Sequence, residues 1–416
     1  MSKNQVLAAL QIENSEIRLV VGEYYNDLFY VICKECLACT GTNGIRFVDN
    51  NKVIESISAA VASASKKINA PIERVILCVP GYRFKKECRE IKTILENKKV
   101  EEHHIIDAIN ESYNTNVGSD YEIISLLCSY YKLNGIVYPK MPLGENGEIL
   151  NSQVDLICGD KLTLYDYVST VEKSGLKIME ICQDGLAACK EAALFEQSFN
   201  SYVINIHLES SHTVYTLISN GRVTFGTSDN SGYDQLIKPI MNTFKLSYRD
   251  ANRILFRYAL IGDENGENRI INKWETDGKT NVITYNDLQK CLIEATNEFL
   301  AKICAYCLPI NGKYQTNIVI TGQGAALQQI SEVLTEKFKR NVSCYCPDKL
   351  GVREHKWCSL VGSFDVYRDN KKFDNNVVNS VDVALYKEKI IDNNDSFKSN
   401  DVMNRLKIIA DKFFGI

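Results

Sequence analysis

The chain has 416 residues, in which 48 Lys and Arg stand against 52 Asp and Glu, for a formal net charge of −4 at pH 7. This length accommodates two domains with a core each, and the slight excess of acid argues against a nucleic-acid-binding protein, which usually carries a basic field. No signal-peptide pattern opens the chain, and no apolar run reaches the roughly 18 residues that span a bilayer. We therefore expect a cytoplasmic or peripheral protein with no nucleic acid among its partners.

Two hairpins of similar design organise the predicted elements. Each consists of an alternating or β-branched strand, a short polar loop and a second strand; the first occupies residues 5–12, 13–16 and 17–22, and the second residues 202–206, 207–212 and 213–218. Asn220-Gly221 supplies a turn after the second hairpin. A hairpin that opens each half of a chain indicates an internally duplicated α/β architecture built around a central cleft.

The remaining elements follow in chain order. Between the hairpins we expect strands at residues 29–37, 74–80, 121–133, 154–159 and 178–182, and helices at 51–67, 105–113, 162–175 and 186–195. After the second hairpin we expect helices at 233–244, 248–259, 285–308 and 327–338, a loop at 262–278, and a strand at 317–321 that leads into Gly322-Gln323-Gly324. The last element of the folded body is expected at 357–366, and the polar residues 367–400 are predicted to be a linker.

The C-terminal residues 401–416 have a different pattern. Apolar side chains repeat at helical spacing, and cations border the stripe, which predicts a short amphipathic helix in a membrane interface. The residues expected to bind lipid are Val402, Arg405, Leu406, Lys407, Ile409, Lys412, Phe413 and Phe414. The alternative is a helix that docks on its own domain, and a linker of more than about thirty residues would be an unusual way to add a core helix.

Cysteines occur at two spacings that suggest a metal site. The chain has 15 cysteines, including a CxxCxxC run at Cys33, Cys36 and Cys39 and a CxxC pair at Cys304 and Cys307. In a strand, however, Cys36 would face opposite to its two neighbours, and the second pair reads as one face of a helix. We interpret the cysteines as small apolar residues of a protein from a reducing compartment, and we predict no metal site.

Five segments resemble, in order, those of the actin-like ATPase superfamily and, within it, the bacterial cell-division protein FtsA family. They are residues 121–135 with Pro142-Leu143-Gly144, residues 165–180, residues 247–258, the IVITGQGA run at 318–325 and residues 357–366. FtsA proteins also end in a helix like residues 401–416, although a Trp of that helix is replaced here by Ile408 or Ile409. The resemblance covers about residues 5–366 and the C-terminal helix.

The resemblance implies an α/β, actin-like fold with two duplicated, ribonuclease-H-like halves. Residues 1–200 would form the first half, with an FtsA-type extra subdomain at 77–161 that contacts the neighbouring subunit of a filament. Residues 201–345 would form the second half, 346–366 would return to the first half, 367–400 would be a flexible linker, and 401–416 would be the membrane-binding helix.

The phosphate loops are where the chain departs from the family pattern. The family's first loop reads approximately D-h-G-[TS]-[ST]-K and the second D-h-G-G-G-T-T-D, whereas this chain has QIENSE at residues 11–16 and NIHLESSH at 205–212. Both loops have lost their first Asp, which would organise hydrated Mg²⁺, and their glycines, which let backbone N–H groups approach an anion. Glu13, Glu16 and Glu209 would meet the triphosphate at a cost of several kcal/mol, unless Glu13 or Glu209 replaced a lost Mg²⁺ ligand.

The rest of the nucleotide site is partly altered. Asn252 and Leu255 stand where the family has the Glu and Lys that contact the ribose. The family's adenosine-side loop, here Gly322-Gln323-Gly324-Ala325, is largely intact, and either packing or nucleotide contact would account for it. The nucleotide-binding residues that the resemblance implies are Gln11, Asn14, Ser15, Asn205, Ser210, Ser211, Gly322, Gly324 and Ala325. We expect ATP and Mg²⁺ to bind weakly or not at all, no catalytic residue, and exposed loop histidines at His207 and His212.

The resemblance implies a protein at the cytoplasmic face of the cell membrane that links the tubulin-like protein FtsZ to the membrane at the division site. It would associate with itself into dimers or filaments, bind lipids through its tail and recruit other division proteins. One alternative is an actin-like polymer whose assembly is switched by ATP binding and hydrolysis, which intact phosphate loops would favour. Another is an actin-fold adaptor of an envelope machine, like the pilus-assembly protein PilM, against which the amphipathic tail argues.

Overall fold

The computed structural model describes residues 5–26, 28–138, 141–263, 268–276, 279–311, 316–371 and 378–386. The first half contains a five-stranded sheet in the order β11-β6-β1-β2-β3. Its strands are β1 (Gln5–Glu13), β2 (Glu16–Tyr25), β3 (Leu28–Ala38), β6 (Arg74–Val79) and β11 (Lys177–Gln183). Even-numbered residues of β1 pack with α1 (Asn50–Ile68) and α3 (Lys161–Lys173), whereas Leu7 and Ala9 pack with α4 (Asp184–Glu191) and α10 (Cys358–Asn370). Alternating apolar side chains thus bury both faces of the sheet.

The second half repeats this plan. Its sheet has the order β14-β13-β12-β17-β18, with β12 (Tyr202–Leu208), β13 (Thr213–Ser219), β14 (Arg222–Asp229), β17 (Thr316–Thr321) and β18 (Val342–Cys344). In both halves a central antiparallel hairpin, β1–β2 or β12–β13, has a parallel strand, β6 or β17, on its other side. The shared topology confirms the predicted duplication.

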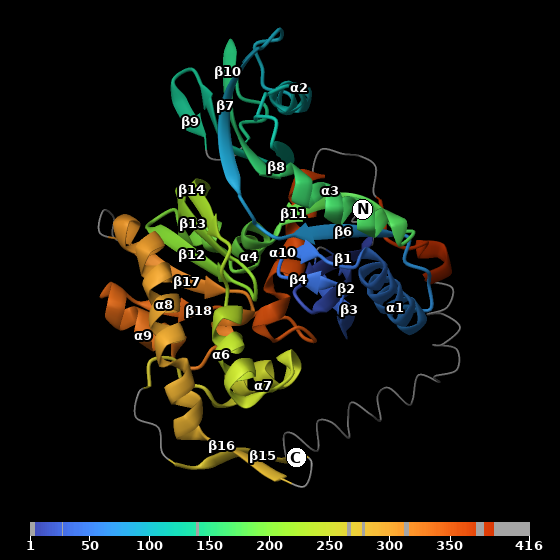
Figure 1. Cartoon of the computed structure of the whole chain (residues 1–416). Coiled ribbons are helices and arrows are strands. Elements are labelled where there is room, and N and C mark those ends of the chain that lie inside the picture. Colours follow the sequence, from blue (N-terminus) through green and yellow to red (C-terminus); the bar gives the residue numbers. More distant parts are fainter. Residues whose placement is uncertain are drawn as a thin grey trace, which may run out of the picture.

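Helices of the second half lie around its core. They are α6 (Asp234–Phe244), α7 (Tyr248–Tyr258), α8 (Tyr285–Asn311) and α9 (Ile330–Phe338), with the 3₁₀ turn η1 (Gln323–Ala326) after β17. Residues 262–278 were expected to be a loop, but β15 (Ile270–Thr276) pairs there with β16 (Lys279–Thr284) in an antiparallel hairpin. This pairing supplies the backbone hydrogen bonds that a polar composition alone does not reveal. The hairpin lies at the bottom of Figure 1.

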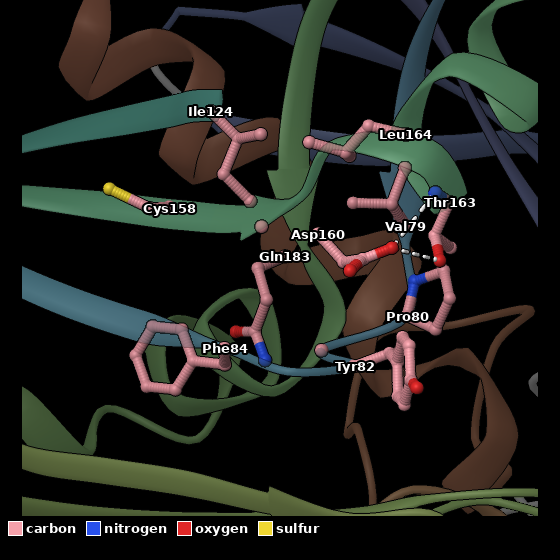
Figure 2. A pocket seen from close by; sticks show the side chains of 12 residues that line it. Val79, Pro80, Tyr82, Phe84, Ile124, Cys158, Asp160, Thr163, Leu164 and Gln183 are labelled. Atoms are coloured by element: carbon pink, nitrogen blue, oxygen red, sulfur yellow. Dashed lines mark hydrogen bonds between the residues drawn. The ribbon is translucent and has the colours of Figure 1, made fainter. Parts of the chain in front are cut away.

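A separate four-stranded sheet stands above the two halves in Figure 1. Its order is β7-β10-β8-β9, from β7 (Lys85–Ile94), β8 (Tyr121–Leu133), β9 (Ile136–Tyr138) and β10 (Ile149–Asp160), and α2 (Glu102–Tyr113) packs on it. A cavity of about 10 Å³, close to the volume that one water molecule needs, lies where this sheet joins the first half. Figure 2 shows Pro80, Phe84 and Gln183 around it, and Asp160 capping the start of α3 through Thr163.

The remaining short elements connect these bodies. They are the β4 (Thr42–Asn43) and β5 (Arg46–Phe47) pair, α5 (Leu194–Gln197) and the 3₁₀ turn η2 (His355–Trp357) before α10. Within the described residues, no helix is both long enough and apolar enough to cross a membrane.

The beginning of the predicted linker is ordered, which corrects the expected boundary at residue 367. Helix α10 continues to Asn370, and residues 378–386 lie against the first half. The Ser380 N–H donates to the Val6 carbonyl, the Ala8 N–H donates to Ser380 Oγ at 2.7 Å, and Ser380 is fully buried. These bonds satisfy backbone groups of β1 that β6, paired only beside residues 9–11, does not reach. The predicted C-terminal helix and its lipid-binding residues, Val402 to Phe414, lie outside the described residues.

Candidate functional site

The loops that close the two central hairpins face each other where the halves meet. The amide of Asn14, in the β1–β2 loop, donates to Asp234 Oδ2 of α6 at 2.6 Å. Asn14 Oδ1 accepts from the Gly44 N–H at 3.0 Å, and the Ser15 N–H donates to Thr42 Oγ1 at 2.9 Å. Protein groups therefore engage the Asn14 side chain and the Ser15 N–H, at positions where the resemblance implies phosphate contacts.

His207, in β12, and His212, in the loop between β12 and β13, are both buried, so the expectation that they are exposed loop residues is wrong. His207 and Glu209 are 0% exposed, and Ser210 and His212 are 1% exposed. The carbonyl oxygens of Glu209 and Ser210 accept N–H groups from the start of α6. A Cβ on Gly232 would lie 2.0 Å from the Glu209 carbonyl oxygen. The segment before α6 thus packs against the backbone of Glu209 and Ser210, while the histidines contact Thr321, Ser359 and Asp184.

Arg18 of β2 is buried at the centre of the junction. Its guanidinium contacts Glu16 Oε1 at 2.5 Å and Glu209 Oε2 at 3.2 Å. It also donates to Gln323 Oε1 at 2.8 Å and to the Lys356 carbonyl oxygen at 3.2 Å. Burial by itself would lower the pKa of Arg18, but Glu209 and Glu16 raise it well above its ordinary value. Arg18 therefore carries a permanent positive charge between carboxylates from both halves.

A second charged pair crosses the junction beside Arg18. His212 Nε2 lies 2.6 Å from Asp184 Oδ2, and both side chains are buried. Burial would lower the pKa of His212, but Asp184 raises it to about 9. Burial would raise the pKa of Asp184, but His212 and His207 hold it below its ordinary value.

His207 is a second buried histidine. Its ring lies 3.0 Å from Thr321 Oγ1 and 3.2 Å from Ser359 Oγ, and burial lowers its pKa. At neutral pH His212 is charged and His207 is neutral.

Glu13 is held as a neutral carboxyl group. Burial and the nearby Glu209 raise its pKa to about 8. Its Oε1 accepts from Gln11 Nε2 at 2.9 Å and its Oε2 from Ser210 Oγ at 3.4 Å. A protonated, internally bonded carboxyl group is not suited to order the water shell of Mg²⁺, which binds ionised oxygen ligands.

The adenosine-side loop has a packing reason for its glycines. Gly322 has φ of 81°, and a Cβ there would lie 2.7 Å from the Leu208 carbonyl oxygen. A Cβ on Gly324 would lie 2.2 Å from Leu208 Cγ, and the Gln323 N–H donates to Glu209 Oε1 at 3.2 Å. Leu208 and Glu209 stand at glycines of the family loop, so side chains from one altered loop fill the space beside the intact one.

The residues expected to bind nucleotide meet at this junction: Gln11, Asn14, Ser15, Asn205, Ser210, Ser211, Gly322, Gly324 and Ala325. Their role in nucleotide binding stays a prediction. Leu255, which stands at a family lysine, belongs to the core of the second half. Sequence reasoning missed Arg18 and Asp184. One signal was available for Arg18, because it interrupts an apolar strand between the buried residues Ile17 and Leu19.

These residues do not fit an ATP phosphate chain with Mg²⁺. The loop atoms that would meet phosphate are buried carboxyl groups, or amides and hydroxyls engaged by other protein groups, and the bulky Leu208 blocks the approach of the backbone. In the part of the chain that the structure describes, no group of three or more His, Cys, Asp and Glu residues could hold a metal ion, and the cysteines are free thiols.

Comparisons with known proteins support the sequence resemblance. Over 371 residues the chain is 24% identical to cell division protein FtsA of Bacillus subtilis, which covers 87% of this chain and 83% of the relative. It is 22% identical over 379 residues to FtsA of Enterococcus hirae, which covers 88% and 84%. No family model matches the chain.

Solved structures with the actin-like fold cover most of the chain at low sequence identity. A PilM–PilN type IV pilus biogenesis complex aligns with a TM-score of 0.59 and 9% identity over 87% of this chain and 98% of that one. MreB5 of Spiroplasma citri, solved with ADP, aligns with a TM-score of 0.50 and 10% identity over 89% and 99%. The chain is therefore a divergent relative of the FtsA cell-division proteins, with an actin-like fold and altered phosphate loops.

Proposed function

We propose that this protein is a division scaffold that tethers FtsZ filaments to the cytoplasmic face of the membrane, recruits other division proteins and binds ATP weakly or not at all. Similarity to FtsA across most of both chains indicates a cell-division protein of the actin-like family. The likeness to the PilM complex concerns the fold alone. The proposed partners are therefore FtsZ, further copies of this chain, other division proteins and lipids bound through residues 401–416.

The observation that carries the scaffold proposal is the burial of carboxyl groups, with the ion pair between Arg18 and Glu209, in the phosphate loops. Glu13 and Glu209 are 4% and 0% exposed, and Arg18 bonds to Glu209 where a nucleotide-dependent relative needs room for phosphate. Opening this site to ATP would expose or break a buried ion pair, which is strongly unfavourable when one partner is left uncompensated. A nucleotide-switched polymer is therefore the weaker alternative.

Titration with a fluorescent ATP analogue in the presence of Mg²⁺ tests the nucleotide part of the proposal. We expect no saturable binding in the micromolar range and no phosphate release above the buffer rate. Micromolar affinity together with Mg²⁺-dependent phosphate release would establish the ATP-switched alternative instead.

Co-sedimentation with liposomes that contain anionic lipid tests the tethering part. The full chain should pellet and should carry FtsZ with it, whereas a chain that ends at Asn400 should leave both proteins in solution. One short amphipathic helix binds modestly, so self-association should strengthen the attachment. A matched full-length control, Phe413→Ser, removes an apolar side chain from the tail without adding a charge. Equal pelleting of all three forms would exclude the tail as the anchor.

A further inference from the structure

We propose that Arg18 holds the two halves closed by bridging them in the absence of nucleotide. The proposal rests on the part of the proposed function that assigns weak or no ATP binding. In the related ATPases that the sequence resembles, the two hairpin loops meet on the phosphates of a bound nucleotide. Here the same two loops meet on a side chain of the protein itself, so closure becomes a property of the chain.

The contacts of Arg18 define this bridge. The residue is 1% exposed and belongs to the first half. Its guanidinium bonds Glu209 and Gln323, which lie in two separate loops of the second half, after β12 and after β17. A planar guanidinium with five N–H donors can satisfy several acceptors at once, which a lysine ammonium at the same position does not reproduce.

The return segment, residues 346–366, contacts the same arginine. Arg18 donates to the Lys356 carbonyl oxygen in η2, the turn that leads into α10 and so back to the first half. Glu16, two residues before Arg18, accepts from the guanidinium Nε. One buried cation therefore ties together β2, both loops of the second half and the segment by which the chain crosses back.

Neighbouring contacts reinforce the closed arrangement. Asp184 of the first half pairs with His212 of the second at 2.6 Å, and Asn14 donates to Asp234 across the junction. The charges near Arg18 come close to balance when Glu13 is neutral, because Arg18, His212 and Lys356 then face Glu16, Glu209 and Asp184. A balanced set needs no external cation or anion to be stable in a buried place.

Hydrogen exchange of the full chain, without nucleotide, lipid or FtsZ, tests the bridge. Useful probes are the N–H groups of Tyr233, Asp234 and Gln323, because their acceptors belong to Glu209 and Ser210, in the loop that Arg18 holds. These bonds lie within the second half and report the release of that loop, whereas small-angle scattering reports the separation of the two halves. In Arg18→Met, exchange at these amides should rise at least about tenfold, and small-angle scattering should report a more open molecule. In Arg18→Lys, exchange at these amides should lie between the rates of the wild type and of Arg18→Met. Lysine keeps the positive charge but lacks the planar set of N–H donors of a guanidinium group.

A matched control removes a cation from a pair that does not join the halves. Lys34 pairs with Glu354 at 2.6 Å, at a partly exposed place where β3 meets the return segment. Lys34→Met should change exchange at the three probe amides less than twofold. Addition of Mg–ATP to the wild type should leave the exchange pattern unchanged, since closure does not depend on a ligand.

Unchanged exchange and scattering in a folded Arg18→Met protein would overturn the proposal. If that variant does not fold, Arg18→Met/Glu209→Gln removes both charges and is expected to fold with rapid exchange at the probe amides. Full protection in this double variant would equally overturn it. The exchange assay contains no membrane or FtsZ, so its result is independent of the liposome experiment. The Arg18 bridge can therefore be contradicted while tethering is supported, and tethering can be contradicted while the bridge is supported.

Discussion

Two of the joints between the second half and the rest of the molecule differ in the kind of contact that holds them. The joint between the hairpin loops is a buried set of charges, in which Arg18 meets Glu209 and His212 meets Asp184. The joint between β7 and β14 depends more on shape, because the Phe84 ring packs against Gly226, where a Cβ would come within 1.8 Å of it. In Figure 1, β14 lies beside the lower end of β7.

The β7–β14 joint also has a charged contact, but that contact reaches solvent. Lys86 Nζ lies 3.1 Å from Asp155 Oδ1 and 2.5 Å from the Val223 carbonyl oxygen, and its side chain is 14% exposed. Water can partly solvate Lys86 if its partner is lost, whereas His212 has no such access. The comparison teaches that the central joint should respond to charge and pH, and the outer joint to the size of side chains.

The largest expected effect comes from removing one charge at the central joint. Asp184→Asn keeps the volume and the acceptor for the Gly81 N–H, but it leaves His212 without its counter-ion. We expect a loss of about 3–5 kcal/mol in the free energy of unfolding, measured in urea. The matched change at the outer joint, Asp155→Asn, should cost about half of that or less. Equal losses would show that the two joints are not electrostatically different.

The next effect is a loss of stability as the pH rises. In the folded chain the pKa of Glu13 is about 8 and that of His212 about 9, against ordinary values of 4.5 and 6.5. Between pH 6.5 and 8 the folded state therefore holds more protons than the unfolded state, so the free energy of unfolding falls, by roughly 3 kcal/mol over this interval.

A fall in pH should lower the stability through other carboxylates of the central joint. The pKa values of Asp184 and Glu16 are below their ordinary values, so their contribution is present above the unfolded pKa and is lost as the pH falls through the folded one. Unfolding in urea, measured from pH values below the ordinary carboxyl pKa up to pH 8, follows both the acid loss and the alkaline loss of stability. His212→Gln should flatten the alkaline limb, and an unchanged slope in that variant would remove His212 from the explanation.

The smallest expected effect concerns size at the outer joint. Gly226→Ala forces the Phe84 ring to move and should cost about 1–3 kcal/mol. The loss should be the same at pH 6.5 and pH 8, because no titrating group is involved. Phe84→Leu in the same chain makes room and should recover part of the loss. A Gly226→Ala cost that is unaffected by Phe84→Leu would mean that the ring is not what the new methyl group meets.

Local patterns were sufficient for the two hairpins and for much of the helix order. The strands of residues 5–25 and 202–219 follow from alternation and β-branched content, which act between near neighbours. The loss of glycines and aspartates from the phosphate loops could also be identified from the sequence. The packing of residues 378–386 on β1 could not be predicted, because their composition is that of a linker and their partners in β1 are more than 370 positions away.

By itself, the sequence determined the duplicated α/β plan, and it showed that the phosphate loops differ from the family pattern, since both depend on residue types within a short window. The amphipathic helix at residues 401–416 stays a prediction. Only the tertiary structure decided that His207 and His212 are buried, that Glu13 keeps a proton, and that Arg18 bonds Glu209 across 191 positions of the chain. The physical reason is that burial and charge pairing depend on which distant segments meet. At this junction Glu209 and Gln323 come from the second half to an arginine whose own strand supplies only Glu16.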